Sequence, residues 1–131
     1  MREIKFKFYI YDKDDILKDV QYATLDSILK DSKIELPDGY YYKVAQYAER
    51  EDKNSAEIYE GNILKITELE TQLSSQETTI HKVECIGSVF EIYPFLPYGR
   101  GRNDLLESTE SKNYEVEVIG NIYENPELLS N

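Results

Sequence analysis

The first clear pattern in the chain is an alternation of apolar and polar positions over residues 2–11. One side carries Ile4, Phe6, Phe8 and Ile10, and the other carries Lys5, Lys7, Tyr9 and Tyr11. This is typical of a half-buried β-strand, because successive side chains of a strand point to opposite faces. The turn-forming run DKDD (12–15) is expected to end that strand.

A change to helical spacing follows. Within the ambiguous stretch 16–33, Leu25, Ile28 and Leu29 fall at i, i+3 and i+4, and Thr24 is placed to cap a short amphipathic helix over 24–33. A Pro-Asp-Gly turn at 37–39 then predicts a strand over about 40–47.

The stretch EIYEGNILKI (57–66) has a glycine between two strand-like runs, after a polar loop over 50–57. Glycine at such a place marks a bulge or a turn with positive φ, and Asn62 tolerates the same conformation better than most residues. We therefore predict a sharp turn at Glu60-Gly61-Asn62 before the next strand.

Two further elements are predicted in the second half. Residues 79–95 resemble a hairpin that turns at Gly87-Ser88, and 114–120 alternates as a strand with one acidic face. Near the end, Asn125 is placed as an N-cap and Pro126 as the first residue of a single helical turn.

Strands outnumber helices, and no βαβ alternation is present, so the predicted class is a mainly β, antiparallel domain with short helical decorations. The 131 residues fit a single domain over 1–131. Its N-terminal strand, helix and strand are expected over 1–47, and a β-rich core over 48–131.

The composition is rich in tyrosine and in acidic residues. The chain has 12 Tyr, four Phe and no Trp, which favours strands and half-buried surfaces and is frequent at protein interfaces. The net charge of −11 repels phosphate and argues against nonspecific nucleic-acid binding. An acidic inhibitor that occupies the basic groove of a host protein stays open, although acids and bases are interspersed.

The sequence also favours a reducing, cytoplasmic setting. The single cysteine, Cys85, cannot form an intramolecular disulfide. The charged N-terminus is unlike a secretory signal, and no run reaches the roughly 20 apolar residues of a membrane-spanning helix.

No catalytic or metal constellation is predicted, and no cofactor is expected. The single histidine, His81, lies about 13 Å from Cys85 if the strand is extended, too far for an ion pair. One Cys and one His cannot supply a structural zinc site. A calcium loop starting at Asp12 fails because Leu17 and Ala23 stand where Gly and Glu are needed.

One basic stretch, PYGRGR (97–102), has the composition of a nucleic-acid contact, with Tyr98 for stacking and Arg100 and Arg102 for phosphate. A surface loop is the preferred interpretation, because the surrounding chain is acidic.

Three stretches resemble the YopX family of phage and prophage proteins: MREIKF (1–6), QYAEREDKNSAEIYEGNILKI (46–66) and EVIGNIYENPELL (117–129). The last is a near-complete match to the end of the family pattern. The middle departs from the family pattern Gln-Tyr-Thr-Gly-Leu-x-Asp-x-Asn-Gly, which is followed by Ile-Tyr-Glu-Gly-Asp. Ala48-Glu49-Arg50 replaces Thr-Gly-Leu, Ser55 replaces the next glycine, and Asn62 replaces the final Asp.

The resemblance implies a small, partly open, barrel-like (SH3-like) domain from a phage or prophage genome, working in the host bacterial cytoplasm and able to self-associate. It brings no catalytic residues. It implies these signature positions: Tyr59, Glu60, Gly61, Asn62, Gly120, Asn121, Tyr123, Asn125 and Pro126. We hypothesise that the two Gly-Asn steps lie near each other and shape the scaffold, in a non-enzymatic accessory protein that binds itself or a host or phage protein.

Overall fold

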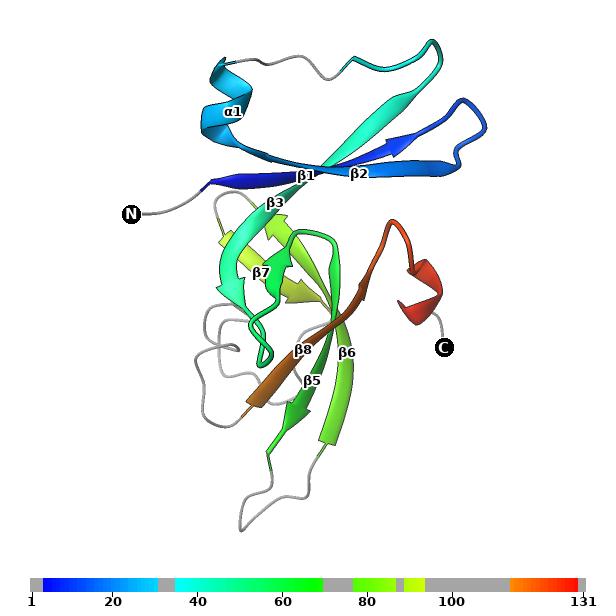
Figure 1. Ribbon diagram of the computed structural model, residues 1–131. Helices are drawn as coiled ribbons and strands as arrows, with labels where there is room; N and C mark the ends of the chain where they lie inside the picture. The colour runs from blue at the N-terminus through cyan, green and yellow to red at the C-terminus, as the bar shows by residue number, and fades with distance from the viewer. Residues whose placement is uncertain (1–3, 31–34, 70–76, 87–88, 94–113, 130–131) are drawn as a thin grey trace.

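The computed structural model describes residues 4–30, 35–69, 77–86, 89–93 and 114–129, and in these residues the chain is mainly β (Figure 1). The elements are β1 (Lys5–Tyr11), β2 (Leu17–Thr24), α1 (Leu25–Lys30), β3 (Tyr41–Glu51), β4 (Glu57–Tyr59), β5 (Asn62–Glu68), β6 (Glu77–Ile86), β7 (Val89–Tyr93), β8 (Tyr114–Asn121) and the 3-10 helix η1 (Pro126–Leu129).

The strands form two four-stranded sheets, and every strand pair is antiparallel. The first sheet has the order β2-β1-β3-β4, and the second has the order β7-β6-β5-β8. The predicted mainly β class is therefore confirmed. The two sheets are separate and are not closed into one barrel.

The N-terminal strand prediction is confirmed as β1, but this strand is buried on both faces at its end. Phe8, Tyr9, Ile10 and Tyr11 are all buried. β1 lies between β2 and β3, where it is covered more fully than an edge strand. Alternation alone could not show this, because tyrosines on the polar side pack into a core instead of facing water.

The predicted short helix is confirmed as α1, and the ambiguous stretch before it contains the edge strand β2. Thr24 caps α1 as expected. The backbone N–H of Ser27 donates to Thr24 Oγ1 over 3.1 Å, and the backbone N–H of Thr24 donates to Ser27 Oγ over 3.0 Å. This reciprocal pair serves as a capping box.

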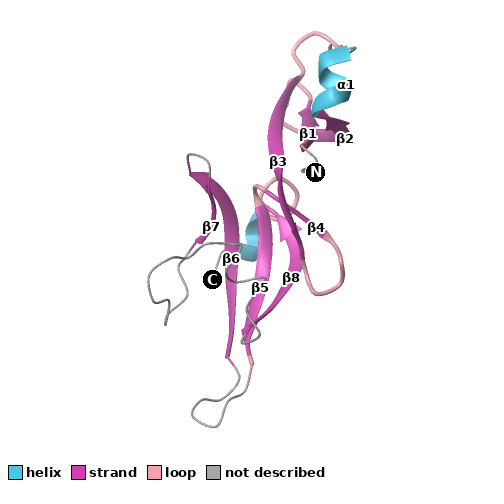
Figure 2. Ribbon diagram, turned by 90° about the vertical axis from the view of Figure 1, so that its left-hand side faces the viewer, coloured by secondary structure: helices cyan, strands magenta, loops and turns pink. Residues whose placement is uncertain are grey.

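The predicted sharp turn at Glu60-Gly61 carries the chain from one sheet to the other. β4 ends at Tyr59 and pairs with β3, whereas β5 begins at Asn62 and pairs with β6 and β8. Figure 2 shows β3 as the long strand that runs from the first sheet down towards the second. The division between the sheets thus lies at this turn.

Two hydrophobic cores meet at β4. The core of the second sheet is aliphatic, with Ala48, Ile58, Leu64, Ile66, Val83, Ile92 and Val116. The core of the first sheet is largely tyrosine, with Tyr9, Tyr11, Ala45 and Tyr59, and with Tyr47 and Tyr123 packed against it. Because neighbouring strand residues point to opposite faces, Ile58 fills one core and Tyr59 the other.

In the second sheet, β6 and β7 form the predicted hairpin, and β8 corresponds to the predicted strand over 114–120. The Gly87-Ser88 turn itself lies outside the described residues. The β5–β8 ladder contains a bulge, since Ile63 faces Gly120 while Leu64 faces Val118. Ile119 is therefore the extra residue of the bulge.

Two turns, at 12–16 and 52–56, share one geometry. In each, an aspartate at the first position accepts hydrogen bonds from the backbone N–H groups two and four residues later. The fourth residue has a positive φ, 63° at Asp15 and 65° at Ser55. The carboxylates of Asp12 and Asp52 thus take the place of backbone acceptors in tight turns.

The second of these turns has a further role, because it lies against the outer edge of β8. Asp52 Oδ2 accepts a hydrogen bond from the backbone N–H of Val118 over 2.8 Å, and the N–H of Lys53 donates to the carbonyl of Val116 over 2.9 Å. A loop of the first sheet therefore satisfies part of the free edge of the second.

Asp52→Ala is expected to destabilise the protein more than the matched variant Asp12→Ala. Both variants lose the local turn bonds, but only Asp52 also bonds across to β8. That additional charge-assisted hydrogen bond is worth about 1.5–3 kcal/mol. Urea unfolding of both variants measures the difference, and equal losses would show that the cross-sheet bond contributes nothing.

Ser55→Gly is expected to stabilise the protein by about 1 kcal/mol, because a positive φ is energetically unfavourable for a residue other than glycine. Ser55 and Glu49 stand at glycine positions of the YopX pattern, and both have positive φ, 65° and 60°. Asn54→Gly, in the same turn but without positive φ, serves as the control and should not stabilise. A fall in the thermal midpoint of Ser55→Gly would contradict the argument.

Candidate functional site

The two Gly-Asn steps of the sequence lie side by side in the β5–β8 ladder. Asn62 pairs with Asn121, and Ile63 pairs with Gly120. The backbone of Gly61 is bonded on both sides, since its N–H donates to the carbonyl of Val83 and its carbonyl accepts from the N–H of Ile122, each over 2.8 Å. The signature residues therefore converge where the chain changes sheets.

Gly61 is required by both its conformation and its neighbours. Its φ is +86°, and a Cβ added there would lie 2.7 Å from Tyr123 Cε2. The Tyr123 ring covers the glycine and stacks on Tyr9 of β1, with centroids 4.1 Å apart and an angle of 22°. A side chain at position 61 would displace this stack.

Asn62 acts through its side chain and does not share the left-handed conformation of Gly61. Its Oδ1 accepts the backbone N–H of Tyr59 over 2.7 Å, and its Nδ2 donates to the carbonyl of Gly120 over 3.4 Å. Asn62 thus ties the end of β4 to β8 across the turn.

The segment after β8 is organised by Asn121. Its Oδ1 accepts the backbone N–H groups of Tyr123 and Glu124 over 3.0 and 2.8 Å, which fixes the turn that presents the Tyr123 ring. Gly120 has no positive φ, but an added Cβ would lie 2.7 Å from Asn125 Oδ1. Glycine is needed there for close approach.

Pro126 is the first residue of η1, as predicted, whereas the side chain of Asn125 does not cap that helix. Its Oδ1 accepts the N–H of Asn121 over 3.3 Å, so the amide is turned back towards β8. Only the carbonyl of Asn125 bonds into η1, to the N–H of Leu128 over 3.1 Å. The N-cap prediction is wrong for the side chain, because the bulged end of β8 offers a nearer donor.

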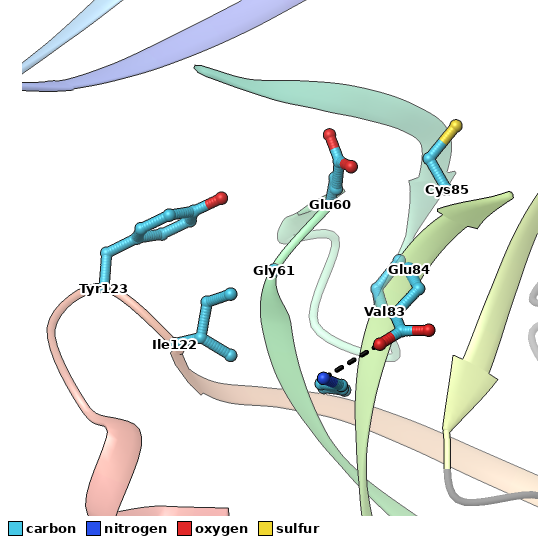
Figure 3. Close-up of a pocket in the computed structure, with 8 residues that line it drawn as sticks. Glu60, Gly61, Val83, Glu84, Cys85, Ile122 and Tyr123 are labelled. Atoms are coloured by element: carbon cyan, nitrogen blue, oxygen red, sulfur yellow. Dashed lines mark ion pairs between the residues drawn. The ribbon is translucent and has the colours of Figure 1, made fainter. Parts of the chain in front are cut away.

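A concavity of about 290 Å³ lies over this junction. It is lined by Glu60, Gly61, Lys82, Val83, Glu84, Cys85, Ile122 and Tyr123. Figure 3 shows the hydroxyl end of Tyr123 directed to the side on which Glu60 lies, and the ion pair between Lys82 and Glu84, 2.8 Å long. With one lysine already paired, Glu60 leaves the concavity acidic.

Two groups of this concavity, the Cys85 thiol and the Tyr123 phenol, have raised pKa values. Burial raises the pKa of the Cys85 thiol, and Glu60 raises it further. Burial also raises the pKa of Tyr123, again with a contribution from Glu60. A thiol kept protonated is a poor nucleophile. The arrangement offers hydrogen-bond donors beside a carboxylate, which suits binding better than bond making.

The remaining candidates from the sequence lie elsewhere. His81 is buried in β6, and its Nε2 is 2.6 Å from Thr79 Oγ1. Within the described residues, no three His, Cys, Asp or Glu side chains gather as metal ligands, and no helix is long and apolar enough to cross a membrane. Tyr98, Arg100 and Arg102 lie outside the described residues.

A second concavity, of about 450 Å³, lies between β1, β2 and β4 and is not predicted by the sequence pattern. It is lined by Lys5, Tyr22, Ala23, Thr24, Ser27, Glu57 and Tyr59. The signal was present in the lysines and tyrosines on the polar side of the first strand. Because the sequence does not show which strand covers that side, the pattern predicted only a solvent-exposed face.

Tyr9→Phe is expected to be at least as stable as the parent at neutral pH. The Tyr9 hydroxyl is buried without a hydrogen-bond partner among the described residues, and such a group costs about 1–3 kcal/mol. Burial raises the pKa of Tyr9 above its ordinary 10.0, so the unfolded chain ionises first and stability falls as the pH rises above 10.

The variant should therefore show a shallower alkaline loss of stability in denaturant titrations at several pH values. Tyr59→Phe is the control, because the Tyr59 hydroxyl donates to Glu57 Oε1 over 3.2 Å and its removal should destabilise. A Tyr9→Phe protein less stable than Tyr59→Phe would refute this account.

Comparison with known proteins agrees with this fold. The family model described as YopX protein matches residues 5–130. The crystal structure of protein EF1440 from Enterococcus faecalis is similar, with a TM-score of 0.52 and 21% identity over 96% of this chain and 97% of that chain. No curated protein matches. Since the family model spans nearly every residue, this chain belongs to the YopX family.

Proposed function

We propose that this protein is a non-enzymatic accessory protein of a phage or prophage that works by protein binding inside the bacterial host, first of all with a second copy of itself. The phage setting is proposed from the resemblance of the sequence to the YopX family of phage and prophage proteins. The binding role is supported chiefly by one observation, an apolar and charge-poor surface on the first sheet.

This surface, the outer face, is the side of the first sheet opposite its tyrosine core. Ile10 pairs with Tyr42 and Phe8 pairs with Val44, so these four side chains share a face. Tyr42 and Val44 are 48% and 40% exposed. The Tyr42 ring meets Phe8 edge-on, with centroids 5.4 Å apart, so the patch is held in shape.

The outer face extends towards α1. The N–H of Leu25 donates to the carbonyl of Ile4 over 3.0 Å, which brings the start of the helix beside the beginning of β1. Ile4 and Leu25 are exposed, and Leu29 of α1 is 73% exposed. Adjoining exposed apolar side chains are a feature of protein-binding surfaces.

Charge distribution favours a second copy as the partner. The chain carries a net charge of −11, which keeps copies apart at most orientations. The ladder positions of the outer face are Phe6, Phe8, Ile10, Asp19, Gln21, Ala23, Tyr42, Val44 and Gln46, of which only Asp19 is charged. Two outer faces therefore meet with little repulsion at the contact, as in interfaces whose centres are depleted of charge.

The acidic concavity at Gly61 supports the non-enzymatic part of the proposal. Its thiol and phenol have raised pKa values, whereas nucleophilic catalysis needs an activated nucleophile. The signature residues around it serve the change of sheet.

Val44→Glu is expected to shift the protein towards monomer, raising the dissociation constant at least about tenfold, because it buries a charge in the contact. Val89→Glu is the matched control, since Val89 on β7 is similarly exposed, at 43%, but lies on the second sheet. Sedimentation equilibrium measures both. A parent protein that stays monomeric at every concentration, with no partner captured from host cells, would overturn the proposal.

A further inference from the structure

The concavity at Gly61 has one carboxylate that no described lining residue neutralises. Two carboxylates and one ammonium line it, and the ammonium of Lys82 is paired with Glu84 over 2.8 Å. The charge of Glu60 is left over. Within the described part of the chain, this carboxylate accepts one hydrogen bond, from the backbone N–H of Gln46 over 3.5 Å. A bond of that length is weak, so the acceptor capacity of Glu60 is largely unused.

The neighbours of Glu60 in the turn have contacts within the fold that account for them. Tyr59 belongs to the tyrosine core, Gly61 provides the positive φ, and Asn62 ties β4 to β8. Beyond its long contact to Gln46, the Glu60 side chain forms no hydrogen bond or ion pair among the described residues, and it lines the concavity. A ligand gives this carboxylate a role that the turn itself does not.

A phenol oxygen faces the same space. The hydroxyl end of Tyr123 is directed to the side on which Glu60 lies (Figure 3). Burial and the charge of Glu60 both raise the pKa of Tyr123, so the phenol is neutral and the two groups interact through space. In the described part of the chain, no hydrogen bond joins them. The phenol oxygen can therefore accept a hydrogen bond from a ligand that also bonds to the carboxylate.

Both acceptors are carried by well-anchored parts of the chain. The Tyr123 ring stacks on Tyr9 at 4.1 Å and lies against Gly61. The backbone N–H of Glu60 donates to the carbonyl of Gln46 over 2.9 Å, which fixes the residue that carries the carboxylate. Groups that are already ordered lose little conformational entropy when a ligand binds. The site is therefore partly formed before any ligand arrives.

The size and the apolar walls of the concavity suit a single side chain. Its volume of about 290 Å³ lies just below the range of about 300–1,000 Å³ that is usual for sites of drug-sized ligands. Val83 and Ile122 give it apolar walls. An arginine side chain combines an apolar stem with a planar head of five N–H donors, which bonds to carboxylates well. The guanidinium is also more weakly hydrated than an ammonium, so it loses less on entering.

We propose that this concavity binds the guanidinium of an arginine side chain from a basic partner protein, with N–H groups donated to Glu60 and to the phenol oxygen of Tyr123. The net charge of −11 attracts a basic partner and repels a second copy of the chain. The partner at this site is therefore a different protein from the one proposed for the outer face. The inference goes beyond the proposed self-association and does not depend on it.

The test is NMR titration of the parent protein with N-acetyl-arginine amide and with N-acetyl-citrulline amide, which has the same shape and no charge. The arginine compound is expected to bind at least about tenfold more tightly, the gain of a hydrogen bond between charged groups. The amide signals of Gly61 and Tyr123 should shift with saturation. No saturable shift with the arginine compound, or equal binding of the citrulline compound, would overturn the proposal.

Variants locate the site. Glu60→Gln should weaken binding of the arginine compound about tenfold or more, and Tyr123→Phe, which keeps the ring stack, about two- to tenfold. Glu117→Gln is the matched control, because it changes the net charge equally at a half-buried position of β8 that does not line the concavity. Equal weakening by Glu117→Gln would show general attraction to an acidic chain and refute the assignment. Unchanged binding in both Glu60→Gln and Tyr123→Phe would refute it too.

A short peptide distinguishes a protein partner from a free small molecule. An arginine flanked by two glycines on each side, acetylated and amidated, should bind at least as tightly as the single capped arginine, because only the side chain enters the concavity. Binding of the peptide more than about tenfold weaker would show that a chain cannot reach the site, and would overturn a protein as the source of the guanidinium.

Val44→Glu separates this site from the proposed function. It should bind the capped arginine as the parent does, whatever its state of association. Loss of binding in Val44→Glu would place the ligand at the outer face and overturn the assignment to the concavity.

Discussion

The contact on which the structure depends is the stack of Tyr123 between Gly61 and Tyr9. Gly61 lets the chain leave the first sheet with a φ of +86°, and its missing side chain leaves room for the Tyr123 ring. That ring lies 4.1 Å from the ring of Tyr9. A residue that follows the last strand of the second sheet is thereby built into the core of the first. Because β4 also fills both cores, neither sheet has a complete core without the other, and we expect them to fold as one unit.

Several backbone groups on the edge strands β2, β4 and β8 are bonded by the chain's own side chains or loops. Asp52 and the backbone of Lys53 bond to the outer edge of β8, and Asn62 takes the N–H of Tyr59 at the end of β4. On the edge strand β2, Asp19 accepts the N–H of Val20. Open edges invite pairing with other chains, and side-chain acceptors remove donors from them. These contacts are consistent with the proposed association through a sheet face, since they leave fewer edge groups for the addition of a strand.

Local patterns in the sequence predicted the elements whose causes are local. The alternation gave β1, Thr24 marked the start of α1, and Gly61 marked the turn. β2 was not predicted, because its polar residues lie at the edge of the sheet, where burial imposes no alternation of apolar and polar residues. The change of sheet at Gly61 could not be predicted, since a turn residue does not state which strands its neighbours will join.

The candidate sites were harder to predict than the fold, because each is formed by residues far apart in the sequence. Lys7 on β1 and Tyr59 on β4 lie far apart in the sequence. In the structure, the Lys7 ammonium is 4.5 Å from the centre of the Tyr59 ring. The sequence shows lysine and tyrosine alternating with apolar residues, a pattern equally typical of a wet surface. What decides between the two is whether another strand covers that side. Here β4 covers it with the aromatic ring of Tyr59 and the carboxylate of Glu57, so the lysine stems pack on tyrosines and Lys5 forms an ion pair.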